Sequence, residues 1–122
     1  MALILIVDDS PTELHVMQKA LERHGYRVAE ASNGLEGMDV LRSFAGPIHL
    51  LLTDVVMPEL SGPQLVHRIH SINADVRCIY MSGYTPEQIR EKGAGDPGCE
   101  YLRKPFTSDM LLSAVRRQLA SC

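Results

Sequence analysis

The sequence has no hydrophobic run long enough to cross a membrane. Its two most aliphatic stretches, Leu3–Val7 and Ile48–Leu52, have the length of strands, whereas a spanning helix needs about 20 apolar residues. The first stretch is also too short for the apolar region of a signal peptide, and it runs directly into Asp8 and Asp9. We therefore expect a cytoplasmic domain that makes no contact of its own with a membrane.

An excess of positive charge is also missing. The chain has 12 Lys and Arg residues against 15 Asp and Glu residues, for a net charge of −3. Domains that bind nucleic acid on their own are normally basic, because most of their affinity comes from the phosphate backbone. The charge balance therefore argues against direct binding of DNA or RNA.

Cysteine is scarce and irregularly placed. There are three cysteines, an odd number, and no Cys-x-x-Cys motif. This usage favours free thiols at Cys78, Cys99 and Cys122 in a reducing cytosol. Cys78 lies inside an apolar run and is expected to be a small residue of the core.

The rest of the composition is typical of one globular domain spanning residues 1–122. Hydrophobic residues make up 45% and charged residues 22% of the chain, and no linker, repeat or low-complexity segment interrupts it. Strand and helix patterns alternate five times, which predicts an α/β domain with a parallel sheet and helices on both faces. The predicted strands are Leu3–Val7, Tyr26–Ala31, Ile48–Thr53, Val76–Met81 and Glu100–Arg103, and the predicted helices are Pro11–His24, Leu35–Ser43, Gln64–Ile72, Pro86–Lys92 and Ser108–Leu119.

Four of the helices begin with a capping pattern. The first is Ser10-Pro11-Thr12-Glu13, in which Ser10 and Glu13 are predicted to form a capping box with proline at the first helical position. Three further pairs follow the same logic, at Asn33 and Glu36, Ser61 and Gln64, and Thr85 and Gln88.

Charged and polar side chains follow four of the five predicted strands. They are Asp8 and Asp9, Asp54, Ser82, and Lys104. Ligands of open parallel sheets bind beyond the carboxyl ends of the strands, so we expect these groups to converge. Clustered carboxylates repel one another unless a cation lies among them, and oxygen ligands suit Mg²⁺. The arrangement predicts phosphoryl transfer, with a carboxylate as a candidate nucleophile.

Each of these residues alone has a plainer explanation, as a turn, a helix cap or a surface charge. Their coincidence at four strand ends favours a site. Two weaker signals are set aside. Gly93–Gly98 matches G-x-G-x-x-G, but it follows a helix and precedes a strand, so we expect a flexible loop. His67 and His70 share a helix face, where a solvated surface is favoured over a metal pair. The methionines are expected to fill core positions rather than a cofactor site; they are Met17, Met38, Met57, Met81 and Met110.

Several strings in the sequence carry a family resemblance along essentially the whole chain. The strings are Val7-Asp8-Asp9, Thr53-Asp54-Val55-Val56-Met57-Pro58 with Gly62, Met81-Ser82-Gly83, and Lys104-Pro105-Phe106. With these motifs the sequence resembles the receiver domain of two-component response regulators, and it is most similar to receivers of hybrid sensor histidine kinases. The resemblance implies a flavodoxin-like (βα)5 fold, three layers thick, with a sheet of strand order 2-1-3-4-5.

The resemblance also implies the roles of the acidic residues. Asp54 would accept a phosphoryl group from a phosphohistidine of a histidine kinase or a histidine phosphotransfer protein. Asp9, Asp54 and the backbone carbonyl of Val56 would bind Mg²⁺, with Asp8 acting through water.

The remaining implied roles concern the phosphate and the response to it. Ser82 and Lys104 would contact the phosphoryl group, and Lys104–Pro105 would be a cis peptide. Tyr101 falls at the aromatic switch position, so phosphorylation would change the face formed by the fourth helix, fifth strand and fifth helix. Val56 and Tyr84 lie two residues beyond Asp54 and Ser82, where side chains of this family border the approach of water.

Two alternative functions remain to be weighed against this one. A degenerate receiver would act as a protein-interaction module without phosphorylation, but none of its expected losses, at Asp54, Lys104 or the acid pair, is found. A phosphatase of the dehalogenase type needs an Asp-x-Asp pair, whereas Asp8 and Asp9 are adjacent. We expect a signalling phosphoacceptor that catalyses only its own phosphorylation and dephosphorylation, either as a stand-alone regulator or as part of a hybrid kinase. The output partner is not identified.

Overall fold

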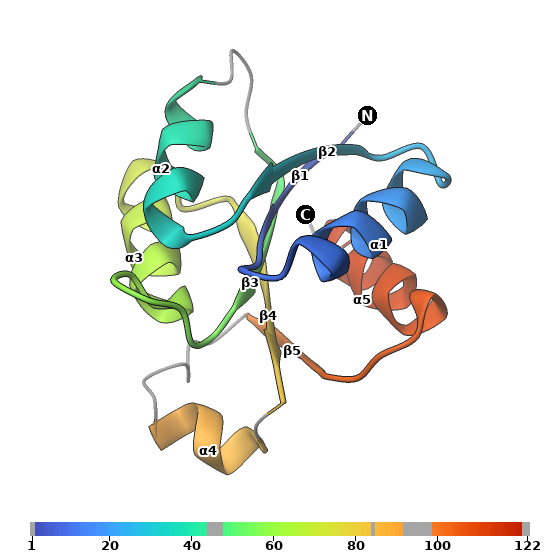
Figure 1. Ribbon diagram of the computed structural model, residues 1–122. Coiled ribbons are helices and arrows are strands. Elements are labelled where there is room, and N and C mark those ends of the chain that lie inside the picture. Colours follow the sequence, from blue (N-terminus) through green and yellow to red (C-terminus); the bar gives the residue numbers. More distant parts are fainter. Residues whose placement is uncertain (1, 44–47, 84, 92–98, 121–122) are drawn as a thin grey trace.

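Five strands and five helices alternate along the chain in the computed structural model, which describes residues 2–43, 48–83, 85–91 and 99–120 (Figure 1). The strands are β1 (Leu3–Val7), β2 (Arg27–Ala31), β3 (Leu50–Asp54), β4 (Arg77–Ser82) and β5 (Glu100–Arg103). The helices are α1 (Pro11–Glu22), α2 (Gly34–Ser43), α3 (Gly62–Ile72), α4 (Pro86–Glu91) and α5 (Ser108–Ala120). Every predicted element is present, with ends shifted by up to two residues.

The sheet is parallel throughout and has the strand order β2-β1-β3-β4-β5, which confirms the flavodoxin-like prediction. β1 and β3 lie inside the sheet, and all five residues of each are buried. This is why their sequences are continuously aliphatic rather than alternating: a strand covered on both faces has no side for water.

Successive residues of β1 enter different cores. Leu3, Leu5 and Val7 belong to the core beneath α2 and α3, while Ile4 and Ile6 belong to the core beneath α1 and α5. In Figure 1 the two helix pairs accordingly flank the sheet on opposite sides. The molecule is a three-layer sandwich in which period-two alternation along each strand supplies both faces.

Helix α4 lies apart from these layers, beyond the ends of β4 and β5 (Figure 1). The α4 side chains whose burial the structure describes, those of Glu87, Gln88, Arg90 and Glu91, are all exposed. The segment Gly93–Gly98, which was predicted to be a flexible loop, lies outside the described residues. The described part of this helix therefore stands as a separate element next to the carboxyl edge of the sheet.

Two of the four predicted capping boxes form completely, and the other two are half formed. Ser61 and Gln64 make a complete capping box, with each side chain bonded to the other's backbone N–H. Thr85 and Gln88 do the same. At α2, Asn33 accepts from the backbone N–H of Glu36 at 2.8 Å. The box at Ser10 is also half formed, because the Ser10 N–H donates to Asp8 and not to Glu13.

The cysteine prediction is wrong for two of the three residues. Cys78 and Cys99 form a disulfide, with a Cα–Cα distance of 5.1 Å. They directly precede the paired residues Ile79 and Glu100 of β4 and β5, so strand pairing brings together two cysteines that are far apart in sequence. Cys122 lies outside the described residues. The expected burial of Cys78 is confirmed.

One smaller expectation also fails, and the solvated histidine face is confirmed only in part, at the exposed His67. Met110 was expected in the core but is 46% exposed, because the buried face of α5 is formed by Leu111, Leu112 and Val115. His70, expected on a solvated face, places Nε2 2.8 Å from the carbonyl oxygen of Val76. Within the described ranges, none of the helices is long and apolar enough to cross a membrane.

Candidate functional site

The carboxyl edge of the sheet brings the predicted side chains together. Asp8 follows β1, Asp54 ends β3, Ser82 ends β4, and Lys104 follows β5. Backbone hydrogen bonds continue just past the strands and hold these positions in register. The Asp8 N–H donates to the carbonyl of Ala31 at 3.1 Å, and the Lys104 N–H donates to the carbonyl of Ser82 at 2.8 Å.

The Lys104 ammonium lies at the centre of the site. Its Nζ is 2.7 Å from Asp54 Oδ1, 2.6 Å from Glu13 Oε2 and 3.4 Å from Asp8 Oδ2. Asp8 is fully buried and the Asp54 side chain is 10% exposed. Buried carboxylates require a compensating charge, and Lys104 supplies it in this structure.

Glu13 is the site residue that the sequence analysis missed. It was assigned to a local capping box, and half of that box exists: its backbone N–H donates to Ser10 Oγ at 3.3 Å. Its carboxylate turns away and contacts Lys104, whereas the Ser10 N–H donates instead to Asp8 Oδ1 at 2.9 Å. The only available sequence signal was an acid in the first turn of the helix that follows Asp8 and Asp9.

Crowding of charges shifts the protonation of the cluster. Burial raises the pKa of Asp8, and hydrogen bonds with Glu13 and Ser10 offset part of that rise. The contact with Asp8 raises the pKa of Glu13 against the opposing effect of Lys104. Burial by itself would lower the pKa of Lys104, but hydrogen bonds to Asp54 and Glu13 outweigh it and raise that pKa. The site therefore favours a charged lysine among carboxylates that resist full ionisation.

The donor set suits a hard cation. One carboxylate oxygen from each of Asp8, Glu13 and Asp54 lies within 4.8 Å of the others, and oxygen donors are what Mg²⁺ prefers. Asp9 is exposed and is not one of these three carboxylates. Its role as a magnesium ligand, with that of the Val56 carbonyl, stays a prediction.

Gly62 is required by the loop that follows Asp54. The Gly62 N–H donates to the carbonyl of Val55 at 2.9 Å. A Cβ atom at Gly62 would collide with the backbone oxygen of Asp54. The start of α3 can therefore lie directly against the strand end, and this fixes the backbone of Asp54.

The candidate switch residues lie beside the site on β4 and β5. Ser82 is 6% exposed. Tyr101 stacks on the fully buried Tyr80 of the neighbouring strand, with ring centroids 5.7 Å apart. The Lys104–Pro105 peptide is cis, as predicted. The structure thus brings Ser82 and Lys104 together at the strand ends. Tyr101 lies on β5, where it pairs with Tyr80 of β4.

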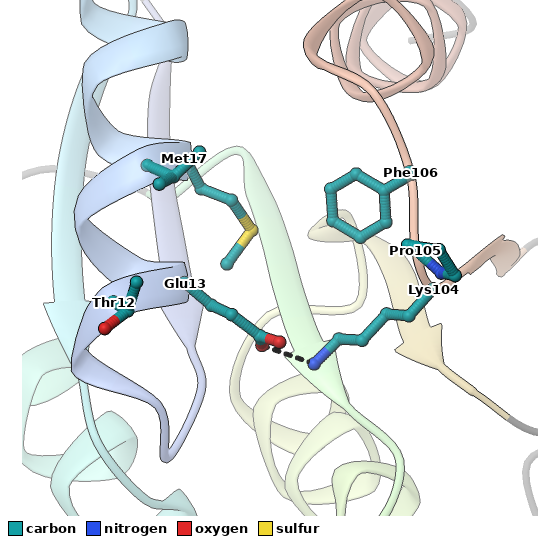
Figure 2. A pocket seen from close by; sticks show the side chains of 7 residues that line it. Thr12, Glu13, Met17, Lys104, Pro105 and Phe106 are labelled. Carbon is teal, nitrogen blue, oxygen red and sulfur yellow. Dashed lines mark hydrogen bonds and ion pairs between the residues drawn. The ribbon is translucent and has the colours of Figure 1, made fainter.

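A groove opens on the α1 side of Lys104 (Figure 2). It encloses about 450 Å³ and is lined by Thr12, Glu13, Val16, Met17, Lys104, Pro105 and Phe106. Figure 2 shows the Glu13–Lys104 ion pair on one side and the Met17 and Phe106 side chains facing across the groove. An apolar surface therefore adjoins the charged site, and Val16 on its rim is 56% exposed.

The chain matches a known family of protein domains over most of its length. The sequence model of the response regulator receiver domain matches residues 4–116. The chain therefore belongs to the response regulator receiver domain family.

Relatives with this domain occur both alone and within larger proteins. Protein PilH of Pseudomonas aeruginosa is 34% identical over 122 residues, which cover 98% of this chain and 99% of PilH. The sensor kinase CckA of Brucella abortus is 30% identical over 118 residues, which cover 97% of this chain but 12% of that kinase. A receiver domain protein from Clostridium thermocellum has a solved structure that matches with a TM-score of 0.86 at 30% identity, covering 99% of this chain and 96% of that one.

Proposed function

We propose that this domain is a phosphorylation-dependent signalling switch that accepts a phosphoryl group on Asp54. The observation that carries the proposal is the Asp54 carboxylate, nearly buried at the end of β3, with the Lys104 ammonium 2.7 Å away. Family membership supports the same role. The donor would be a phosphohistidine of a histidine kinase or of a histidine phosphotransfer protein.

The transfer follows from the charges in the site. An Asp54 carboxylate oxygen attacks phosphorus, and the P–N bond to the histidine breaks with its electron pair going to the departing ring nitrogen. The imidazole leaves as a neutral group because its other ring nitrogen already carries a proton. Lys104 already pairs with Asp54, so its ammonium is in place to pair with the phosphoryl oxygens as negative charge shifts onto them. Ser82, at the end of the neighbouring strand, would supply a hydroxyl donor to the same group.

Asp8, Asp9, Asp54 and the Val56 carbonyl are the groups that we propose to hold Mg²⁺. When bound, the cation would neutralise charge on the phosphoryl oxygens. The buried, mutually repelling carboxylates of Asp8 and Asp54 are the feature of this chain that calls for it.

The output would be a rearrangement of the α4–β5–α5 face. Phosphorylation adds negative charge beside Ser82, and the adjacent Tyr80–Tyr101 stack links that strand end to β5. Hydrogen exchange with and without beryllofluoride, which mimics a phosphoryl group, should change between residues 82 and 101. Unchanged exchange with Asp54 occupied would contradict the switch.

The proposal makes this domain a phosphoacceptor rather than an enzyme with a separate substrate. We place it in the cytoplasm, without direct nucleic acid or membrane contact, as one receiver domain over residues 1–122. The apolar groove beside Glu13 and Lys104 is the open side by which a phosphodonor protein could reach the site.

The test is phosphorylation by a small donor. Incubation with phosphoramidate and Mg²⁺ should add the mass of one phosphoryl group to the wild type and none to Asp54→Asn. Asp39→Asn, which changes an exposed acid paired with Arg42 on α2, should be modified like the wild type. A wild type that stays unmodified, also with histidine kinases as donors, would favour the alternative of a phosphorylation-independent interaction module.

A further inference from the structure

Two helices begin with the same capping pattern but use it differently. At α3, Ser61 and Gln64 bond to each other's backbone in both directions. At α1, Ser10 caps the backbone of Glu13, but the Glu13 carboxylate does not return to the Ser10 N–H. That N–H is taken by Asp8. Glu13 is therefore free of the cap and available to the site.

The Glu13 carboxylate pairs with Lys104 about as closely as Asp54, the candidate phosphoacceptor, does. Lys104 Nζ lies 2.6 Å from Glu13 and 2.7 Å from Asp54. Figure 2 shows the Glu13 side chain extending from the first turn of α1 to meet the lysine. Lys104 is thus shared between Asp54 and a carboxylate outside the motifs of the resemblance.

We propose that Glu13 is a positioning residue that holds Lys104 in the unphosphorylated site and competes with the phosphoryl group for it. This inference rests on the proposed function. An arriving phosphoryl group needs the ammonium, and its negative charge is repelled by a carboxylate bonded to that same ammonium. Glu13 therefore opposes phosphorylation and favours the unmodified state.

The partial exposure of the pair sets the size of the effect. The Glu13 side chain is 44% exposed and that of Lys104 is 23% exposed, so solvent and salt screen their attraction. Removing the Glu13 charge should strengthen binding of beryllofluoride roughly three- to tenfold, as expected for a partly screened ion pair. The gain should shrink as salt is added, because wild type loses the same interaction by screening.

Glu13→Gln is the test variant, and Glu36→Gln is its matched control. Glu36 also lies in the first turn of a helix, and its backbone N–H also bonds to a cap side chain. Its carboxylate accepts from the Ser32 hydroxyl at 2.8 Å. Both variants lose the same favourable interaction with a helix N-terminus, but only Glu13→Gln changes the partners of Lys104.

Beryllofluoride affinity is measured by titration at saturating Mg²⁺, at low and high salt, with the Mg²⁺ dissociation constant of each variant measured separately. We expect tighter binding by Glu13→Gln at low salt, a smaller gain at high salt, and no change in Glu36→Gln. Equal affinities of Glu13→Gln and wild type would overturn the inference, as would a gain of the same size in Glu36→Gln. Weaker Mg²⁺ and beryllofluoride binding in Glu13→Gln would instead make Glu13 a metal ligand and also overturn it. If wild type binds no beryllofluoride, the proposed function itself fails.

Discussion

Lys104 and Asp54 form an ion pair across a strand that separates them. Asp54 ends β3, Lys104 follows β5, and β4 lies between these strands in the sheet. The lysine side chain spans that gap because all three strands are parallel and end at the same edge. The contact therefore depends on sheet order, and it ties the candidate phosphoacceptor to the start of the β5–α5 connection.

Replacing Lys104 should destabilise the fold at neutral pH. The pKa of Lys104 is raised in the folded protein, so its contribution is present below its ordinary value of 10.5 and is lost as pH rises through the higher folded-state pKa. Lys104→Met leaves Asp8 and Asp54 without their cation and should cost about 2 kcal/mol, between the values for exposed and buried ion pairs. Urea unfolding at pH 7 measures the loss, and an unchanged midpoint would contradict it.

Magnesium should stabilise the folded protein. Burial and the neighbouring Asp54 carboxylate raise the pKa of Asp8, so a cation that binds only the folded site relieves repulsion. At a hundred times its dissociation constant it should add about 2.7 kcal/mol. Thermal unfolding with and without Mg²⁺ tests this. Asp9→Ala should lose most of the response and Asp39→Ala should keep it; a full response in Asp9→Ala would remove Asp9 from the site.

The ion pair between Glu100 of β5 and Arg117 of α5 should stabilise the protein at neutral pH but not at acidic pH. Burial alone would raise the pKa of Glu100, but hydrogen bonds from Arg117 and Gln118 outweigh it and lower that pKa below 4.5. The stability it contributes is therefore present above the unfolded-state pKa and lost as pH falls through the folded-state value. Glu100→Gln should melt a few degrees below wild type at pH 7 and level with it by about pH 3. A constant difference at both pH values would contradict this reason.

Reduction of the Cys78–Cys99 disulfide should lower stability. The cysteines are 21 residues apart, and closing a loop of that size is worth about 3 kcal/mol in the chain-entropy account. A phosphine reductant should therefore lower the unfolding midpoint of wild type but not that of Cys99→Ala, which has no bridge. The proposed cytoplasmic location favours reduced thiols, so alkylation in intact cells followed by mass measurement shows which state the cell maintains.

The phosphoryl group on Asp54 should be long-lived. Val56 lies two residues beyond Asp54 and is 51% exposed, so a hydrocarbon side chain faces the solvent there and can neither orient nor activate water. Tyr84, the other residue predicted to obstruct water, lies outside the described residues. Decay of the purified phosphoprotein should quicken severalfold in Val56→Asn or in Tyr84→Ala. Equal decay rates in wild type and both variants would exclude this explanation.

The order of elements and four site positions were predictable from the sequence. Continuous aliphatic runs identified β1 and β3, because a strand buried on both faces needs apolar residues throughout. Asp8, Asp54, Ser82 and Lys104 could be assigned to one edge, because parallel strands place their carboxyl ends together. Both predictions follow from the local sequence pattern and from the geometry of parallel sheets, so they could be made without knowing any distance between side chains.

Only the tertiary structure decided which side chains that are distant in the sequence contact one another and which are buried. The Glu13 carboxylate had a plausible local partner in the Ser10 N–H, and only the position of Lys104 shows why it turned away. Cys78 and Cys99 looked like isolated thiols until strand pairing set their Cα atoms 5.1 Å apart. Met110 was expected in the core with the other methionines, yet Leu111, Leu112 and Val115 form the buried face of α5 and Met110 is exposed. In each case two chemically reasonable partners or surfaces were available, and packing selected between them.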